Sequence, residues 1–263
     1  MILGICGATD EDRIKLAKGA GYRYIEAWLP RFCGSDENRA NYEDFRRALD
    51  KHKIRCEVGQ FAFPGEYNQD GAQTDAQIER IRDYVSSMLE ATSDLCVERL
   101  VIGAGGARVL PSPDKYENAM EQMADILRRA VSPALDEFGV IAALEPLVKK
   151  ETAMLNTTAQ GVRLAKMAGC TNIKVMVDLY HSANEDKDFG EFPGYKGYIM
   201  HSHIGRPSPR RHPAPDDGYD YAPFFAALRS AGFNGRMSLE AQANEPDYKT
   251  SIENAFKVLE PLL

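Results

Sequence analysis

The chain has 263 residues, a mass of 29.3 kDa and 44% hydrophobic residues, so it is long enough for either two small domains or one α/β barrel. Its formal charge of -7 disfavours a protein that binds nucleic acid over a broad surface, because such binding needs clustered Lys and Arg. The N-terminus lacks a cationic segment before a long apolar run, and no segment approaches the ~20 apolar residues of a membrane span, so we expect a cytoplasmic protein with no membrane partner.

Short apolar runs rich in β-branched residues recur along the chain without polar alternation, which is typical of buried parallel strands. In chain order, the predicted strands span residues 2–6, 22–28, 55–62, 99–104, 140–146, 172–180, 198–204 and 235–241. Segments with helical periodicity follow most of these strands, at residues 10–20, 42–52, 75–91, 115–130, 158–169, 222–232 and 248–263.

Eight strand-then-helix units with no linker between them favour the α/β class and a single (β/α)8 TIM barrel over residues 1–263. The sixth helix is expected to be short or missing within residues 184–197. Pro133 is expected to kink the fourth helical segment or to begin a second short helix. The alternative is a six-stranded doubly wound sheet with a small appendage, but no GxGxxG turn follows the first strand.

Polar side chains close four strands in the second half of the chain. Glu145 ends the fifth strand, Asp178 the sixth with His181 three residues later, His201 and His203 the seventh, and Glu240 the eighth. The C-terminal ends of barrel strands meet at one mouth, so we expect these side chains to lie together. Because burying them unpaired would be costly, they should share a cation or satisfy one another.

Three carboxylates and one imidazole form an oxygen-rich donor set, which suits a hard or borderline divalent ion such as Mn²⁺, Mg²⁺ or Co²⁺. We favour Mn²⁺, with Zn²⁺ as a less favoured alternative. The positions that the protein leaves open on the ion would accept the carbonyl and hydroxyl oxygens of a sugar. The ion would then act as a Lewis acid and stabilise an enediolate.

The segments LEPLVKKE, VDLYH, HSHIGRPSPRR and MSLEA, in this order and spacing, resemble the xylose isomerase-like barrels. Specifically, they are similar to the sugar phosphate isomerase/epimerase family, which includes ketose 3-epimerases. The resemblance covers essentially the whole chain and is sharpest from about residue 140 onward. It is fairly specific for the superfamily and does not identify a substrate.

The resemblance implies roles for individual residues. The metal ligands would be Glu145, Asp178, His203 and Glu240, and the groups that contact substrate oxygens would be His181, Glu151 and Arg210. Arg211 is the alternative to Arg210, because the loop is one residue longer here than in the family. By the same analogy, Glu145 and Glu240 would be the catalytic acid and base on opposite faces of the sugar.

Other residues have weaker assignments. Period-two alternation puts His201 on the same side of its strand as His203 but farther from the mouth, so we expect a packed core histidine there. Trp28, which closes the second strand together with Glu26, is either a stacking wall for a sugar ring or ordinary packing. Arg108, in the glycine-rich run GAGGAR, would approach a phosphate or carboxylate of the substrate unless the run is a plain tight turn. The scattered cysteines, with no CxxC pair, are expected to be reduced core residues.

The leading hypothesis is a divalent-metal-dependent isomerase or epimerase of a keto-sugar or a related polyhydroxy carbonyl compound, with a small-molecule sugar as its partner. A lyase on the same scaffold, such as an inosose or dehydroshikimate dehydratase, begins with the same proton abstraction and stays open. An apurinic endonuclease is less favoured, because the third and fourth strands end without the further histidines that a three-zinc cluster needs. A sugar-binding protein without catalysis and a homo-oligomer are also left open.

Overall fold

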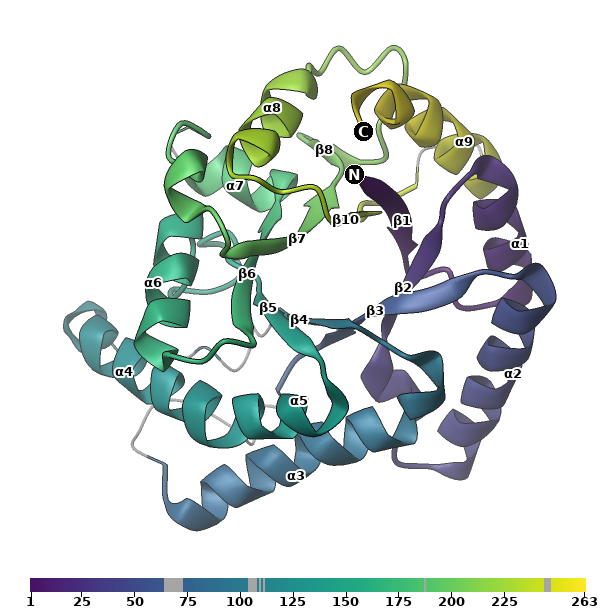
Figure 1. Cartoon of the computed structure of the whole chain (residues 1–263). Helices are drawn as coiled ribbons and strands as arrows, with labels where there is room; N and C mark the ends of the chain where they lie inside the picture. Colours follow the sequence, from purple (N-terminus) through teal and green to yellow (C-terminus); the bar gives the residue numbers. More distant parts are fainter. Residues whose placement is uncertain (64–72, 104–107, 109, 111, 187, 244–246) are drawn as a thin grey trace.

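The computed structural model describes residues 1–63, 73–103, 108, 110, 112–186, 188–243 and 247–263 (Figure 1). Eight parallel strands close into a barrel in the order β1-β10-β7-β6-β5-β4-β3-β2, which confirms the predicted TIM barrel. The strands are β1 (Ile2–Cys6), β2 (Tyr24–Trp28), β3 (Arg55–Phe61), β4 (Arg99–Ile102), β5 (Ile141–Leu144), β6 (Ile173–Asp178), β7 (Ile199–Ile204) and β10 (Arg236–Leu239).

Helices surround the ring of strands (Figure 1). They are α1 (Glu11–Ala20), α2 (Asp36–His52), α3 (Asp75–Ala91), α4 (Tyr116–Ile126), α5 (Ser132–Phe138), α6 (Thr158–Ala168), α7 (Leu179–Glu185), α8 (Ala222–Ser230) and α9 (Tyr248–Leu259). Side chains cap many of them: the Thr74 and Thr157 hydroxyls begin α3 and α6 as parts of capping boxes. α2 begins six residues before the expected residue 42, because the Ser35 hydroxyl accepts the N–H of Asn38.

The sixth strand ends earlier than predicted. The sequence suggested a strand over 172–180, but α7 begins at Leu179, because the carboxylate of Asp178 accepts the backbone N–H of Tyr180 and caps the helix. The sixth helix is short, as expected, but lies before residues 184–197 rather than mainly within them. α5 begins at Ser132, with Pro133 in its first turn, after a wide π-helical turn at Leu127–Val131, which confirms the second short helix as one of the two predicted outcomes.

A small hairpin follows β7 and was not predicted. β8 (Arg206–Pro207) and β9 (Arg210–Arg211) pair antiparallel, with Arg206 opposite Arg211 and Pro207 opposite Arg210. A bridge between Arg211 and Gln242 ties the hairpin to the segment after β10. The proline-rich run after β7 is therefore an ordered structure that fixes where each arginine points.

Most of the core lies between the barrel and its helices, and a smaller cluster fills the barrel itself. The inner cluster consists of Tyr24, Val58, Val101, Ala143 and Met176. Gly4 on β1 leaves room for the Tyr24 ring, which a Cβ at that position would strike. The interior of the barrel is thus a packed core, with polar side chains toward the C-terminal ends of the strands.

The cysteines are free, and their burial differs. Cys56 is buried and three others are half-buried, but Cys96 is exposed, so the expectation of a core residue was wrong there. Cys96 lies in the connection between α3 and β4, and such connecting segments usually run over the protein surface.

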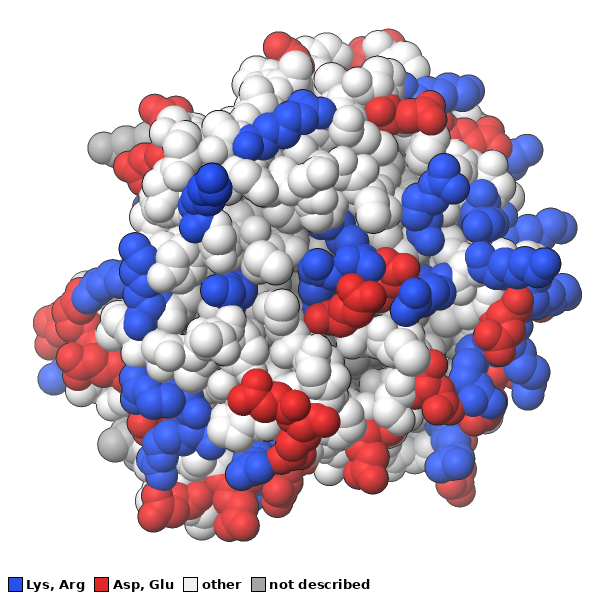
Figure 2. All heavy atoms as spheres, in the orientation of Figure 1, with Lys and Arg blue, Asp and Glu red and all other residues white. Residues whose placement is uncertain are grey.

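The described part of the chain contains no helix with the length and apolar composition needed to cross a bilayer. On the face that Figure 2 shows, Lys and Arg are interspersed with Asp and Glu rather than gathered into one basic surface.

Candidate metal centre and active site

Four of the predicted side chains meet at the C-terminal ends of the strands. Glu145 follows β5, Asp178 ends β6, His203 lies near the end of β7, and Glu240 follows β10. One donor atom from each of the four lies within 4.8 Å of the others. The Nδ1 of His203 is 3.4 Å from Glu145 Oε1, 3.9 Å from Asp178 Oδ2 and 3.3 Å from Glu240 Oε2. The four residues therefore form one cluster of three carboxylates and one imidazole.

The two nitrogens of His203 have different surroundings. Nε2 lies 2.8 Å from Glu26 Oε1, whereas Nδ1 has no hydrogen-bond partner among the described residues although the ring is fully buried. Three carboxylates around Nδ1 favour a positive charge at this point. A divalent cation bound by the four donors would supply that charge, so the donor set of this structure fits such an ion.

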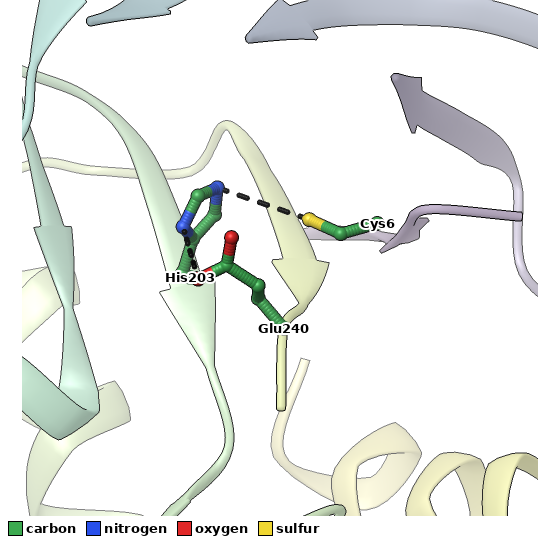
Figure 3. A group of neighbouring side chains, drawn as sticks. All are labelled: Cys6, His203 and Glu240. Carbon is green, nitrogen blue, oxygen red and sulfur yellow. Dashed lines mark hydrogen bonds and ion pairs between the residues drawn. The ribbon is translucent and has the colours of Figure 1, made fainter. Parts of the chain in front are cut away.

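Cys6 is a competing ligand, because Cys6, His203 and Glu240 are also close enough to share an ion (Figure 3). Its Sγ is 4.0 Å from His203 Nε2, but Glu26 already holds that nitrogen at 2.8 Å. Burial raises the pKa of the Cys6 thiol well above its usual value. The cluster of four supplies three oxygen donors and leaves Nε2 of His203 with Glu26, so it is the better site for a hard divalent cation.

His181 lies at the rim of the cluster with a defined tautomer. Its Nδ1 accepts the backbone N–H of Val148 at 3.0 Å, so the neutral ring carries its proton on Nε2. Nε2 lies 3.8 Å from both Glu145 Oε1 and Asp178 Oδ2. His181 thus presents a hydrogen-bond donor to the cluster.

The β8-β9 hairpin brings Arg210 to the cluster. Arg210 Nη2 is 2.6 Å from Asp178 Oδ2 and also contacts Glu240 Oε2, and its guanidinium lies 4.7 Å from the centre of the Tyr180 ring. Arg211 points elsewhere and donates to the carbonyl of Ala243. Of the two alternatives, the structure places Arg210 beside the cluster.

Charges within the cluster shift its pKa values in opposite directions. Burial alone would raise the pKa of Glu240, but His203 and Arg210 outweigh it and lower the pKa to about 2. Burial would lower the pKa of His203, yet Glu26 and Glu240 hold it well above its usual value. For Asp178, burial dominates over Arg210 and raises the pKa.

Three further predicted residues lie around the cluster. Trp28 ends β2 with 42% of its surface exposed. Glu151 is exposed in the loop after β5, close enough to raise the pKa of Arg210. Arg108 is only 2% exposed, and it donates to the carbonyls of Ile102 and Glu145 at 2.9 and 2.6 Å.

Arg108 thus ties the end of β4 to the end of β5 and does not present its guanidinium to solvent. Its predicted contact with a substrate phosphate or carboxylate has no support in this placement. Residues 104–107, the rest of the glycine-rich run before it, lie outside the described residues.

Sequence reasoning gave no role to several side chains that contact the cluster. Glu26 binds both His201 and His203, and Gln60, at the end of β3, donates to Glu240 Oε1 at 3.1 Å. The available signal was period-two alternation, because Tyr24, Glu26 and Trp28 share one side of β2. His201 is fully buried and bonded to Glu26, which confirms the expected core histidine.

Comparisons with known proteins agree with the fold. The family described as xylose isomerase-like TIM barrel matches residues 14–260. A D-psicose 3-epimerase of Agrobacterium fabrum is 30% identical over 143 residues, which cover 52% of this chain and 48% of that protein. An L-ribulose 3-epimerase of Mesorhizobium japonicum is 28% identical over 151 residues, which cover 55% of this chain and 48% of that protein. The matches thus span about half the length of these curated relatives.

A solved structure of a D-psicose 3-epimerase in the presence of D-fructose superposes with a TM-score of 0.84. The comparison covers 100% of this chain and 99% of that chain at 17% sequence identity. At this identity the likeness concerns the fold.

Proposed function

The chain belongs to the xylose isomerase-like TIM barrel family, and from this premise we propose that it is a divalent-cation-dependent isomerase or epimerase of a small keto-sugar or a related polyhydroxy carbonyl compound. One observation carries the proposal. The donor atoms of Glu145, Asp178, His203 and Glu240 converge within 4.8 Å at the C-terminal ends of the barrel strands. The sequence relatives named as epimerases of D-psicose and L-ribulose support the same class of reaction.

Glu145 and Glu240 are the proposed proton-transferring groups. They follow β5 and β10, which β6 and β7 separate in the barrel, so the two carboxylates approach from different strands. This arrangement supports removal of a proton from a carbon next to the carbonyl by one carboxylate and its return by the other. His203 and Arg210 lower the pKa of Glu240, so the proton-accepting carboxylate is the populated form at neutral pH.

His181 and Arg210 are the proposed donors to substrate oxygens. His181 offers the proton on Nε2, and Arg210 offers a guanidinium that the hairpin holds beside Asp178. Both groups donate, and the hydroxyl and carbonyl oxygens of a sugar accept. Trp28 would supply an apolar wall from β2, and Glu151 would accept from a substrate hydroxyl at the rim.

The proposed cation is Mn²⁺, with Mg²⁺, Co²⁺ and Zn²⁺ as alternatives. The carboxylates of Glu145, Asp178 and Glu240 would hold it together with Nδ1 of His203. When bound, a divalent ion supplies Lewis-acid stabilisation of the negative charge that develops on the carbonyl oxygen.

Proton exchange in D₂O tests the proposal. The protein is incubated with Mn²⁺ and D-psicose, D-fructose or L-ribulose, and NMR follows deuterium at the carbon next to the carbonyl. We expect exchange with at least one ketose, and its loss when Mn²⁺ is removed. Absence of exchange with every ketose while Mn²⁺ is bound would contradict the proposal.

The same spectra separate the reaction classes. An epimerase returns the deuteron to the sugar and keeps its hydroxyl groups. Loss of water from the substrate would instead assign the chain to the lyases.

A further inference from the structure

A buried carboxylate joins the two walls of the barrel beside the cluster. Glu26 lies on β2 with no exposed surface, and β1 and β10 separate β2 from β7 in the ring. Its Oε1 is 2.8 Å from His203 Nε2, and its Oε2 is 2.8 Å from His201 Nε2 and also accepts the hydroxyl of Ser238. Glu26 thus reaches across the barrel to three donors.

The direction of each of these hydrogen bonds follows from the chemistry of a carboxylate, which only accepts when it is ionised. His203 and His201 must therefore both carry a proton on Nε2. Ser238 donates to Glu26, so its oxygen accepts from Tyr24 Oη at 2.7 Å. The contacts all converge on Glu26, which fixes the position of both its oxygens.

The contact matters most for His203. When a cation binds, the ring keeps its proton on Nε2, where Glu26 accepts it, and the lone pair of Nδ1, the nitrogen that faces the three carboxylates, is available to the ion. The opposite tautomer would put a proton on Nδ1, and the ring would then donate to the carboxylates instead of binding an ion.

We propose that Glu26 is a positioning residue for the cation site: it holds Nε2–H of His203 and so presents Nδ1 to the cluster of Glu145, Asp178 and Glu240. The inference rests on the proposed cation site. A carboxylate behind a metal-binding histidine fixes the orientation and tautomer of the ring, and its loss typically weakens metal binding by about 10-fold to 100-fold.

His201 provides a matched control. It makes the same 2.8 Å contact with the same carboxylate and is equally buried, and it is not one of the four clustered donors, although Glu26, His201 and His203 are also close enough to share an ion. A purely structural role of Glu26 would give Glu26→Gln and His201→Asn similar effects, namely a lower Tm without a change in cation affinity. With a positioning role, Glu26→Gln would lower the cation affinity much more than His201→Asn would.

The test compares Mn²⁺ affinity, measured by calorimetry or by EPR of the free ion, in the wild type, Glu26→Gln and His201→Asn, with folding checked by circular dichroism. We expect Glu26→Gln to bind Mn²⁺ about 10-fold to 100-fold more weakly and His201→Asn to stay within about 3-fold of the wild type. Equal Mn²⁺ affinity of wild type and a folded Glu26→Gln would overturn the inference. If Glu26→Gln does not fold, Glu26→Asp takes its place, because the shorter side chain keeps the charge but withdraws from His203.

NMR gives a readout that a structural role would not move. In protein with ¹⁵N-labelled histidine and Zn²⁺ as a diamagnetic ion, we expect His203 to carry its proton on Nε2 and the metal on Nδ1. A proton on Nδ1 of His203 would contradict the inference. A wild type that binds neither Mn²⁺ nor Zn²⁺ would instead contradict the cation site itself, so the two failures are distinguishable.

Discussion

The two halves of the barrel contribute differently to the candidate site. β5, β6, β7 and β10 carry the four clustered donors at their ends. Residues of β2, of β3 and of the segment after β4 contact those donors: Glu26 is hydrogen-bonded to His203, Gln60 to Glu240, and Arg108 to the backbone carbonyl of Glu145.

In a closed barrel, the two halves can have different roles in one site. Strands that are distant in sequence face each other across the interior, so one wall presents ligands while the opposite wall orients them. The residue types in the sequence, such as Asp, Glu and His at strand ends, identify only the wall that presents the ligands. The wall that orients them is identified only from its contacts in the structure.

Removal of a donor from the second half should have the largest effect. Glu240→Gln keeps the shape of the side chain but removes the negative charge and the proton acceptor. We expect kcat for the sugar reaction to fall on the order of 10³-fold and Mn²⁺ binding to weaken. Glu253→Gln, on α9 beside Lys249, is the control and should leave both unchanged. Equal activity of the two variants would remove Glu240 from the site.

His212 lies in the second half of the chain but outside the cluster of four donors. Burial lowers its pKa to about 4, and its Nδ1 is hydrogen-bonded to the hydroxyl of Ser251 on α9 at 2.9 Å. His212 takes up a proton near pH 6.5 in the unfolded chain and only near pH 4 in the folded chain. Its contribution to the free energy of unfolding is therefore fully present above pH 6.5 and is lost as the pH falls from 6.5 to 4.

Denaturant unfolding of the wild type and His212→Asn at pH 7 and pH 4.5 measures this contribution. The wild type should lose roughly 2.4 kcal/mol more than the variant between the two pH values. Parallel losses would show that His212 does not act through its protonation.

Gly103 tests whether the first half shapes the donors of the second. It follows β4, and an added Cβ would overlap Oε2 of Glu145. Gly103→Ala should displace that carboxylate, and a misplacement of about 1 Å costs on the order of 10²-fold in rate. Gly19→Ala in α1 is the control, because among the described residues nothing lies within 4 Å of its added Cβ. Unchanged turnover of Gly103→Ala would mean that Glu145 adjusts freely.

The smallest effect concerns the helical shell, in which the two halves should be alike. Thr74 and Thr157 both begin helices with capping boxes, one in each half. Thr74→Ala and Thr157→Ala should each lower the free energy of unfolding by about 1 kcal/mol, with Mn²⁺ affinity unchanged. A loss of Mn²⁺ affinity in either variant would show that the helices around the barrel also affect the cation site.

The barrel could be predicted because apolar strands and amphipathic helices alternate eight times along the chain. The errors lie where local contacts decide: the capping of α7 by Asp178 shortened β6, and the pairing of Arg206 with Arg211 made a hairpin from a proline-rich run. Neither contact leaves a periodic pattern in the sequence.

The donors could be predicted because each ends a strand, and strand ends share one mouth. The role of Glu26 could not, because its contact with His203 exists only once β2 and β7 face each other across the closed barrel. The register of the hairpin likewise separates Arg210 from Arg211, and hydrogen bonds to backbone carbonyls keep the guanidinium of Arg108 away from solvent.

An anomalous-scattering map of crystals of this chain soaked with Mn²⁺ tests directly whether the four donors hold one cation. The account predicts one strong peak enclosed by the side chains of Glu145, Asp178, His203 and Glu240, on the Nδ1 side of the imidazole ring. A map without a peak among these four residues, or with its main peak elsewhere on the protein, would contradict it.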